Sequence, residues 1–204
     1  MRQPTRLVAA LAAVFLFCQT QLASAYDTAL PHIWPLDPWK ISNLKITVPT
    51  FGPINISLAI ENPNTVSAGP EPQNNGYLPF APSAANCSVT AERGAGPMKA
   101  ECVETSQFSY GVFRVTGNNI SPPNFTLAFN LEYNVTRWNS PMWKVYDAPA
   151  TFEVGKNLTL GKYDNATRAW TYELRPENTP FEIPPAMTDC HGYCYIPPPT
   201  NDTR

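Results

Sequence analysis

The side chains best suited to acid–base or nucleophilic chemistry are scarce in this chain. It has two histidines, His32 and His191, and each lies in a terminal segment beside Pro or Cys. A Ser-His-Asp hydrolase needs a positioned imidazole, and the sequence has no Gly-x-Ser-x-Gly elbow, phosphate-binding Gly loop or zinc-protease His pair. Glu132 and Glu153 are carboxylates on the polar faces of expected strands, where ordinary solvation explains them. We therefore predict a protein that is not an enzyme and uses no cofactor.

The segment from Arg137 to Tyr146 carries two tryptophans and a tyrosine, and the sequence indicates a loop there. Its candidate binding residues are Arg137, Trp138, Trp143 and Tyr146. Aromatic faces next to Asn and Arg can stack on sugar rings or anchor a protein partner. The alternative is that the two tryptophans cap the end of the core, and the sequence leaves both interpretations open.

Four cysteines remain once Cys18, which lies in the N-terminal leader, is set aside: Cys87, Cys102, Cys190 and Cys194. An even number predicts two disulfides, and four cysteines allow three pairings. We favour the local pairing, in which Cys87–Cys102 staples a hairpin and stabilises the fold by about 3 kcal/mol. The alternative, a metal site in Cys190-His191-Gly192-Tyr193-Cys194, would need reduced thiols that a secreted chain rarely keeps. We expect no bound metal.

Residues 1–25 have the features of a secretory signal peptide. Arg2 and Arg6 precede an apolar run of eleven residues, and Ala23-Ser24-Ala25 fits the cleavage rule of signal peptidase. The run is too short to span the roughly 30 Å of a bilayer core. The sequence therefore predicts a secreted, extracellular chain with no membrane span after cleavage.

Asn-x-Ser/Thr sequons support the same compartment. Eight of the 17 asparagines lie in such sequons, well above the two or three that chance would give. This excess indicates a heavily glycosylated secreted protein. The candidate glycosylation sites are Asn55, Asn86, Asn119, Asn124, Asn134, Asn157, Asn165 and Asn201.

Composition and charge set the class of protein. The chain is 43% hydrophobic and 15% charged, which predicts a folded core rather than disorder. Without the leader, whose charged residues are two arginines, the formal charge of −2 becomes −4. A nucleic-acid partner would need a basic patch, so we exclude it.

Period-two alternation of apolar residues predicts strands. It is clearest over 125–135 and 54–61, and the sequons at Asn55 and Asn134 fall on the polar faces of these strands. Weaker strands are expected over 39–48, 86–92, 98–102, 108–115, 150–154, 158–160 and 169–174. Seven to nine short strands without helical periodicity predict an all-β, disulfide-stapled antiparallel sandwich or barrel.

The domain is expected over residues 39–182, with a long loop at 62–85. Pro-rich segments flank it: an N-terminal arm at 26–38 and a C-terminal tail at 183–204. A loop of this length is either functional or disordered.

Several short motifs, taken in order, resemble a known family. A Trp-led strand (Trp39-Lys40-Ile41-Ser42) is followed by the strand with Asn-Ile-Ser-Leu and by Cys87-Ser88-Val89-Thr90-Ala91. Cys102 follows fifteen positions after Cys87, ahead of an aromatic strand with Phe108 and Tyr110. Over roughly residues 38–175 this order resembles the small secreted fungal proteins like the Alternaria major allergen.

The resemblance implies a compact antiparallel β fold secreted by an ascomycete fungus, without known catalytic residues. It also implies an effector- or allergen-like role in binding host defence proteins or small ligands. The chain departs from the family in its close-spaced C-terminal cysteines and in lacking a cysteine after the leader, so a disulfide-linked dimer is not implied. The 62–85 loop and the Pro-rich tail are also extra.

Two functions from different classes follow. The first is a secreted, non-enzymatic protein that binds an unknown extracellular protein through its loops. The second is a carbohydrate-binding or cell-wall-associated module whose polysaccharide ligand is held by the segment from Trp138 to Tyr146.

Overall fold

The structure is a computed structural model that describes residues 36–70, 77–93, 96–106, 111–118, 120–137 and 140–194. The chain divides into two units, 1–32 and 33–204, and all described residues belong to the second. The expected signal peptide and most of the expected N-terminal arm lie outside the described residues. Within the described part of the chain, no helix has the length and hydropathy needed to cross a membrane.

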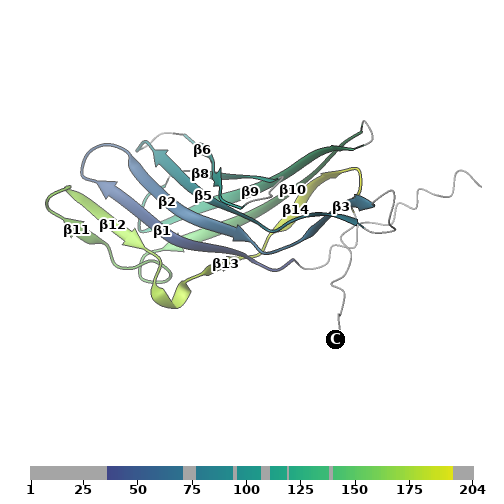
Figure 1. The fold of residues 1–204 in the computed structure, drawn as a ribbon. Helices are drawn as coiled ribbons and strands as arrows, with labels where there is room; N and C mark the ends of the chain where they lie inside the picture. The colour runs from purple at the N-terminus through teal and green to yellow at the C-terminus, as the bar shows by residue number, and fades with distance from the viewer. Residues whose placement is uncertain are drawn as a thin grey trace, which may run out of the picture. The chain divides into compact units, whose positions relative to one another are not determined.

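Two antiparallel sheets pack face to face as a β-sandwich (Figure 1). The larger sheet has seven strands among the described residues, and all of its pairings are antiparallel. Its path is β11 (Lys162–Asp164), β12 (Ala169–Glu173), β1 (Trp39–Pro49), β2 (Ile54–Asn62), β5 (Ser83–Ala91) and β7 (Val103–Glu104), and β13 (Phe181–Ile183) also pairs with β1.

The smaller sheet has five strands in the described ranges, centred on one long hairpin. Its order is β14 (Ala186–His191), β10 (Ser140–Glu153), β9 (Asn124–Arg137), β8 (Gly111–Gly117) and β6 (Met98–Glu101). The strands β9 and β10 pair along all 14 residues of each. This hairpin therefore fixes which of its side chains face the core.

Alternation along the central strands builds the core, as the sequence predicted. The inward side chains of β9, from Phe125 to Tyr133, are at most 4% exposed, and those of β2 behave in the same way. In β1 a bulge between Ser42 and Lys45, with Asn43 at φ 53°, shifts the register so that both Ile41 and Leu44 face inward. The all-β antiparallel fold expected from the sequence is confirmed, and of the two expected architectures, sandwich or barrel, it is the sandwich.

The prediction of a long loop at 62–85 is wrong for the described residues. The strand β2 continues to Asn62, β3 (Val66–Pro70) pairs with β4 (Tyr77–Phe80), and β5 begins at Ser83. Burial explains the difference, because Val66, Ala68 and Phe80 are at most 2% exposed and pack into the core.

The prediction of an extended C-terminal tail from residue 183 onward is also wrong for residues 183–191. There β13 ends at Ile183, and β14 pairs with β10 along the edge of the smaller sheet. Residues 195–204 lie outside the described residues. The expected strand at 158–160 is not formed: Leu158 makes isolated bridges to Val154 and Leu174 just after the turn at 155–157. The strand expected at 150–154 is the end of the much longer β10.

Both disulfides follow the favoured local pairing. Cys87 in β5 joins Cys102, which follows β6, and Cys190 in β14 joins Cys194. The thiolate metal site considered for residues 190–194 is therefore ruled out. Among the described residues, no group of three or more His, Cys, Asp or Glu side chains could hold a metal ion.

Candidate functional site

The predicted aromatic loop is a β-hairpin rather than a loop. Arg137 is the last residue of β9, Trp143 and Tyr146 lie within β10, and the two strands pair continuously. Trp138 and the side chain of Arg137 lie outside the described residues. The prediction of a binding loop is therefore wrong in its local structure, because both flanks of the turn continue as paired strands.

Tyr146 is 1% exposed, which removes it as a residue that could contact a ligand on the surface. Its ring packs edge-on against Tyr133, with centroids 6.2 Å apart, and its hydroxyl is buried without a hydrogen-bond partner. Burial, and then the nearby Tyr133, raise the pKa of Tyr146. The residue is a core residue of the sandwich.

Trp143 lies on the outer face of the smaller sheet and is half-buried. Its ring stacks on His191, with centroids 4.2 Å apart and planes 14° from parallel. Its indole Nε1 donates a hydrogen bond of 2.9 Å to Asp189 Oδ2. One face and the polar edge of the indole are thus occupied by the neighbouring strand β14.

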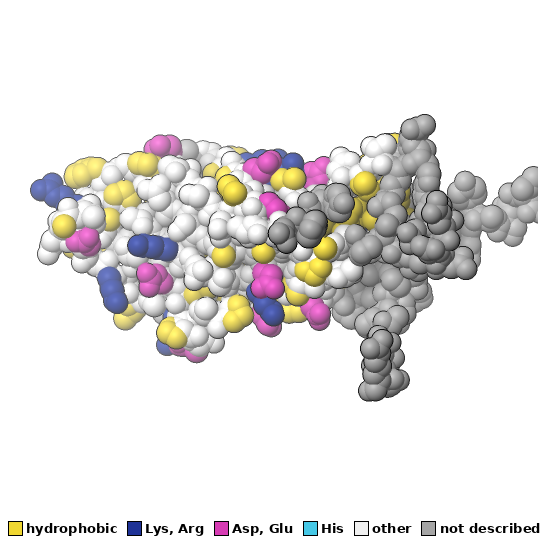
Figure 2. Space-filling view, viewed as in Figure 1, with side chains coloured by type: hydrophobic (Ala, Val, Ile, Leu, Met, Phe, Trp, Pro, Cys, Tyr) yellow, Lys and Arg dark blue, Asp and Glu magenta, His cyan; other side chains and the backbone are white. Residues whose placement is uncertain are grey.

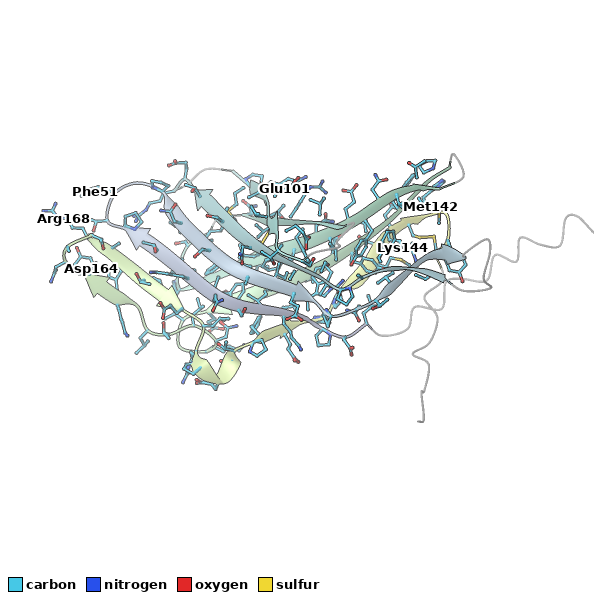
Figure 3. All side chains as sticks on the ribbon, in the orientation of Figure 1. Phe51, Glu101, Met142, Lys144, Asp164 and Arg168 are labelled. Carbon is cyan, nitrogen blue, oxygen red and sulfur yellow. A yellow bond between two sulfur atoms is a disulfide. The ribbon has the colours of Figure 1, made fainter. Side chains whose placement is uncertain are left out.

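Lys144 is a buried lysine that the sequence analysis did not single out. It comes from β10 at the end of the sandwich near β3 and β14 (Figure 3). It is 2% exposed, and its Nζ donates a 2.6 Å hydrogen bond to the backbone oxygen of Ser67 in β3. The Tyr193 ring lies 5.8 Å from the same Nζ. Burial lowers the pKa of Lys144 to about 8.

Other buried polar groups satisfy one another beside Lys144, which pairs across the sheet with Tyr133. The Tyr133 hydroxyl accepts a 2.8 Å hydrogen bond from Asn62 Nδ2 and lies 3.4 Å from Ser83 Oγ. Burial raises the pKa of Tyr133, and these two hydrogen bonds oppose that effect. Such a paired network suits a structural role, because buried polar groups are tolerated when their hydrogen bonds are made.

The opposite end of the sandwich exposes aromatic side chains. Tyr163 in β11 and Trp170 in β12 are 43% and 45% exposed, and their ring centroids lie 5.2 Å apart. We call these two residues the edge aromatic pair. They lie on the hairpin at whose tip Asp164 and Arg168 are seen in Figure 3.

Register explains why these rings share a face. Tyr163 pairs with Trp170, and Trp170 pairs with Val48 of β1, so all three side chains leave the same side of the larger sheet. Tyr172, two residues after Trp170, lies on that face as well. Gly161 makes room for them, because a Cβ there would lie 2.6 Å from Tyr172 Cε1 and 3.0 Å from Trp170 Cε3.

The tight turn between the two strands is held by its own side chains. Asp164 accepts hydrogen bonds from the Ala166 backbone N–H at 2.9 Å and from Thr167 Oγ1 at 2.8 Å. These bonds hold the pKa of Asp164 below its usual value. Both N–H and Oγ1 of Thr50 donate to the backbone oxygen of Arg168 at 2.8 Å, which ties this turn to the turn between β1 and β2.

A cleft of about 340 Å³ adjoins the edge aromatic pair. Val48 and Tyr172, the sheet neighbours of Trp170, are two of its lining residues, and Arg93 and Ser121 supply polar groups. The remaining lining residues are Ile54, Ile120 and Pro122. Polar and apolar groups contribute about equally to the exposed surface of this cleft, which suits a ligand that has both apolar faces and hydrogen-bonding groups.

Charge on the surface is sparse and mixed. On the face shown in Figure 2, the Lys and Arg side chains are few and interspersed with Asp and Glu. Glu132 and Glu153 are the two carboxylates considered from the sequence. Glu132 Oε2 forms an ion pair with Arg114 Nη1 at 2.5 Å, and Glu153 Oε2 lies 3.8 Å from Lys156 Nζ. Both carboxylates therefore have charge partners in the fold.

The sequons differ in how the fold presents them. Asn119 and Asn201 lie outside the described residues. The exposed ones are Asn55, Asn86, Asn124, Asn134 and Asn165.

Asn157 is 7% exposed; its Oδ1 accepts a hydrogen bond from the Glu153 N–H, and its Nδ2 donates to the Thr151 oxygen. These hydrogen bonds hold the side chain in a buried position that leaves little room for a sugar on Nδ2. We therefore expect glycopeptide mass spectrometry of the chain produced through a eukaryotic secretory pathway to find Asn157 empty and Asn165 occupied. High occupancy at Asn157 in folded protein would contradict the expectation.

Comparison of the chain with protein-family models, with curated proteins and with solved structures gives no match.

Proposed function

We propose that this chain is a secreted, glycosylated, non-enzymatic protein that acts by extracellular binding, and that its ligand is a carbohydrate held on the edge aromatic pair. The observation that carries the proposal is the exposure of Tyr163 and Trp170 on one face, next to the cleft lined by Tyr172. Solvated aromatic rings that lie side by side are unusual unless they contact something.

Sugar rings suit such a surface because one face of a pyranose is lined by C–H bonds. That face packs on an aromatic ring, while the hydroxyl groups at the rim remain available for hydrogen bonds. Arg93 and Ser121 lie in the adjoining cleft and can supply those hydrogen bonds. Tyr163 and Trp170, with centroids 5.2 Å apart, would then hold one or two neighbouring sugar units.

Secretion supports the same class of ligand. The leader, the sequons and the two disulfides all suit an extracellular protein. The fungal allergen- or effector-like proteins that the chain resembles are expected to act by binding as well. A wall polysaccharide is a ligand that a secreted fungal protein would meet, so the resemblance and the aromatic pair point to one proposal.

A pelleting assay tests the proposal. The mature glycosylated chain is mixed with insoluble chitin, β-glucan, cellulose or plant cell wall, and the free protein is measured against total protein. We expect saturable retention on at least one polymer, weakened by about tenfold in Trp170→Ala and by less in Tyr163→Ala. Phe51→Ala is the control, because Phe51 is a single ring, 82% exposed, on the neighbouring turn between β1 and β2. It tests whether any exposed ring at this end of the sandwich would serve. Failure on all four polymers, or equal loss in the Phe51 variant, would overturn the carbohydrate proposal.

A further inference from the structure

Three side chains form a row across the outer face of the smaller sheet. Trp143 of β10 pairs in register with Asn134 of β9 on one side and with His191 of β14 on the other. Directly opposite residues in antiparallel strands have Cβ atoms about 4.5–5.5 Å apart, so their side chains meet. Asn134 is exposed and lies in the sequon Asn134-Val135-Thr136.

The orientation of the indole is set by β14. Its ring stacks on His191 at 4.2 Å, and its Nε1 bonds to Asp189 of the same strand. Because β14 and β9 lie on opposite sides of β10, the other face of the indole is turned toward β9. Asn134 is the residue of β9 that lies beside it.

We propose that the N-glycan on Asn134 packs its first N-acetylglucosamine against the face of Trp143 that is turned toward β9. The first sugar is bonded directly to Asn Nδ2, so it is the part of the glycan that stays within reach of a cross-strand neighbour. Its apolar C–H face and acetyl methyl group can cover the indole, while its hydroxyls stay in solvent. His191, Trp143 and the sugar then form one continuous stack.

This inference depends on the secretion proposed above, but it does not depend on a polysaccharide ligand. It assigns Trp143 a partner within the same molecule. The tryptophan named from the sequence as a candidate for binding an outside ligand therefore acts as a platform for the chain's own glycan.

A second strand sequon provides a matched contrast. Asn55 is exposed in the interior of the larger sheet, and its register neighbours are Thr47 of β1 and Thr90 of β5. Thr90 Oγ1 donates a 3.0 Å hydrogen bond to Asn55 Oδ1. Asn55 and Asn134 thus occupy similar strand positions. Asn134 has an aromatic register neighbour, Trp143, whereas the register neighbours of Asn55 are threonines.

A double-mutant cycle tests the packing. The chain is secreted from a eukaryotic host and trimmed enzymatically to one N-acetylglucosamine per site, and occupancy at Asn134 is measured by mass spectrometry. We expect Asn134→Gln to lower the Tm by about 2–4 °C when Trp143 is present, and by about 0–1 °C in the Trp143→Ala background. Asn55→Gln should shift the Tm equally in both backgrounds.

A measurement on the unmutated, trimmed protein keeps the proposal falsifiable if Trp143→Ala does not fold. The ring current of Trp143 should move the acetyl methyl NMR signal of the sugar on Asn134 upfield of the signal from Asn55. An occupied Asn134 with an unshifted methyl signal would overturn the proposal. So would an Asn134 sequon that stays empty in the secreted chain, or equal Tm shifts in both backgrounds. Because no polysaccharide is used, these results are independent of the pelleting assay.

Discussion

Two hairpins of this protein carry aromatic residues, and they use them in opposite ways. The hairpin of β9 and β10 lies in the middle of the smaller sheet, with β8 and β14 on its two sides. The hairpin of β11 and β12 lies at the edge of the larger sheet and has three register pairs. Tyr146 in the central hairpin is 1% exposed, whereas Trp170 in the edge hairpin is 45% exposed.

The difference shows that position in a sheet, more than local composition, decides what an aromatic side chain can do. A central strand meets neighbours on both sides and a second sheet on its inner face, so its rings are buried or stacked. At the edge of a sheet fewer neighbours are available, and the rings remain open to a ligand. Each of the following changes tests one side of this comparison.

The largest effect is expected from Tyr146→Ala in the central hairpin. The change removes a fully buried ring that packs on Tyr133, and should lower the free energy of unfolding by about 3–5 kcal/mol. Urea denaturation measures it. Tyr146→Phe is the control, because it keeps the ring and removes a buried hydroxyl that has no partner, so it should be neutral or stabilising. A mild Tyr146→Ala phenotype would mean that the central hairpin is less tightly packed than the structure shows.

The next effect is a pH dependence that comes from Lys144. Its pKa is about 8 in the fold and 10.5 in the unfolded chain, so the unfolded chain binds more protons between these values. Stability should therefore rise as pH increases from 8 to 10, by on the order of 2 kcal/mol. Above pH 10 the raised pKa values of Tyr133 and Tyr146 act in the opposite direction, because the unfolded chain then loses their protons first.

Urea denaturation at several pH values between 7 and 10 measures this dependence. Lys144→Met should remove the rise between pH 8 and 10 while keeping a side chain of similar length in the core. If the variant and the unchanged protein show the same pH profile, Lys144 is not the group responsible.

The sequence could predict some strands and both disulfides, but it could not predict others, and Lys144 shows why. Alternation over 125–135 was enough to predict β9, and cysteine spacing was enough to favour the observed disulfides. The inward positions of β10 include Lys144, and a charged residue there hides the alternation that would have identified a strand. The strands β3, β4 and β14 are short, and what holds them is pairing and burial in the finished sandwich.

The candidate site was harder to predict than the fold. Tyr163 and Trp170 are no more conspicuous in the sequence than Trp143 and Tyr146. Their exposure follows from the edge position of β11, and strand order depends on contacts between residues far apart in the chain. A turn signal at Asp164-Asn165 predicts a hairpin at best, and does not say whether its rings face solvent.

Parallel substitutions in the two hairpins provide the direct functional test of the comparison. Trp170→Ala should weaken retention on the polysaccharide by about tenfold, because a stacking contact of about 1.4 kcal/mol is lost. Trp143→Ala should change retention by less than about twofold, since its ring is engaged by His191 and Asp189. Pelleting isotherms measure both. Loss of retention in the Trp143 variant, with its folding verified by circular dichroism, would return the binding site to the central hairpin.

A smaller loss of retention than in Trp170→Ala is expected at Gly161, where the edge hairpin makes room for its rings. A methyl group there would lie 2.6 Å from Tyr172 Cε1 and 3.0 Å from Trp170 Cε3. In Gly161→Ala the Tyr172 ring must therefore move aside, and the Trp170 ring must give by a few tenths of an ångström. We expect retention to fall by about two- to fivefold, because a small displacement weakens ring packing without removing it. Gly96→Ala is the matched control, since a Cβ there meets nothing within 4 Å. If both variants bind as well as the unchanged protein, the sugar does not depend on the exact placement of these rings, and exposure alone would account for the edge hairpin's part in binding.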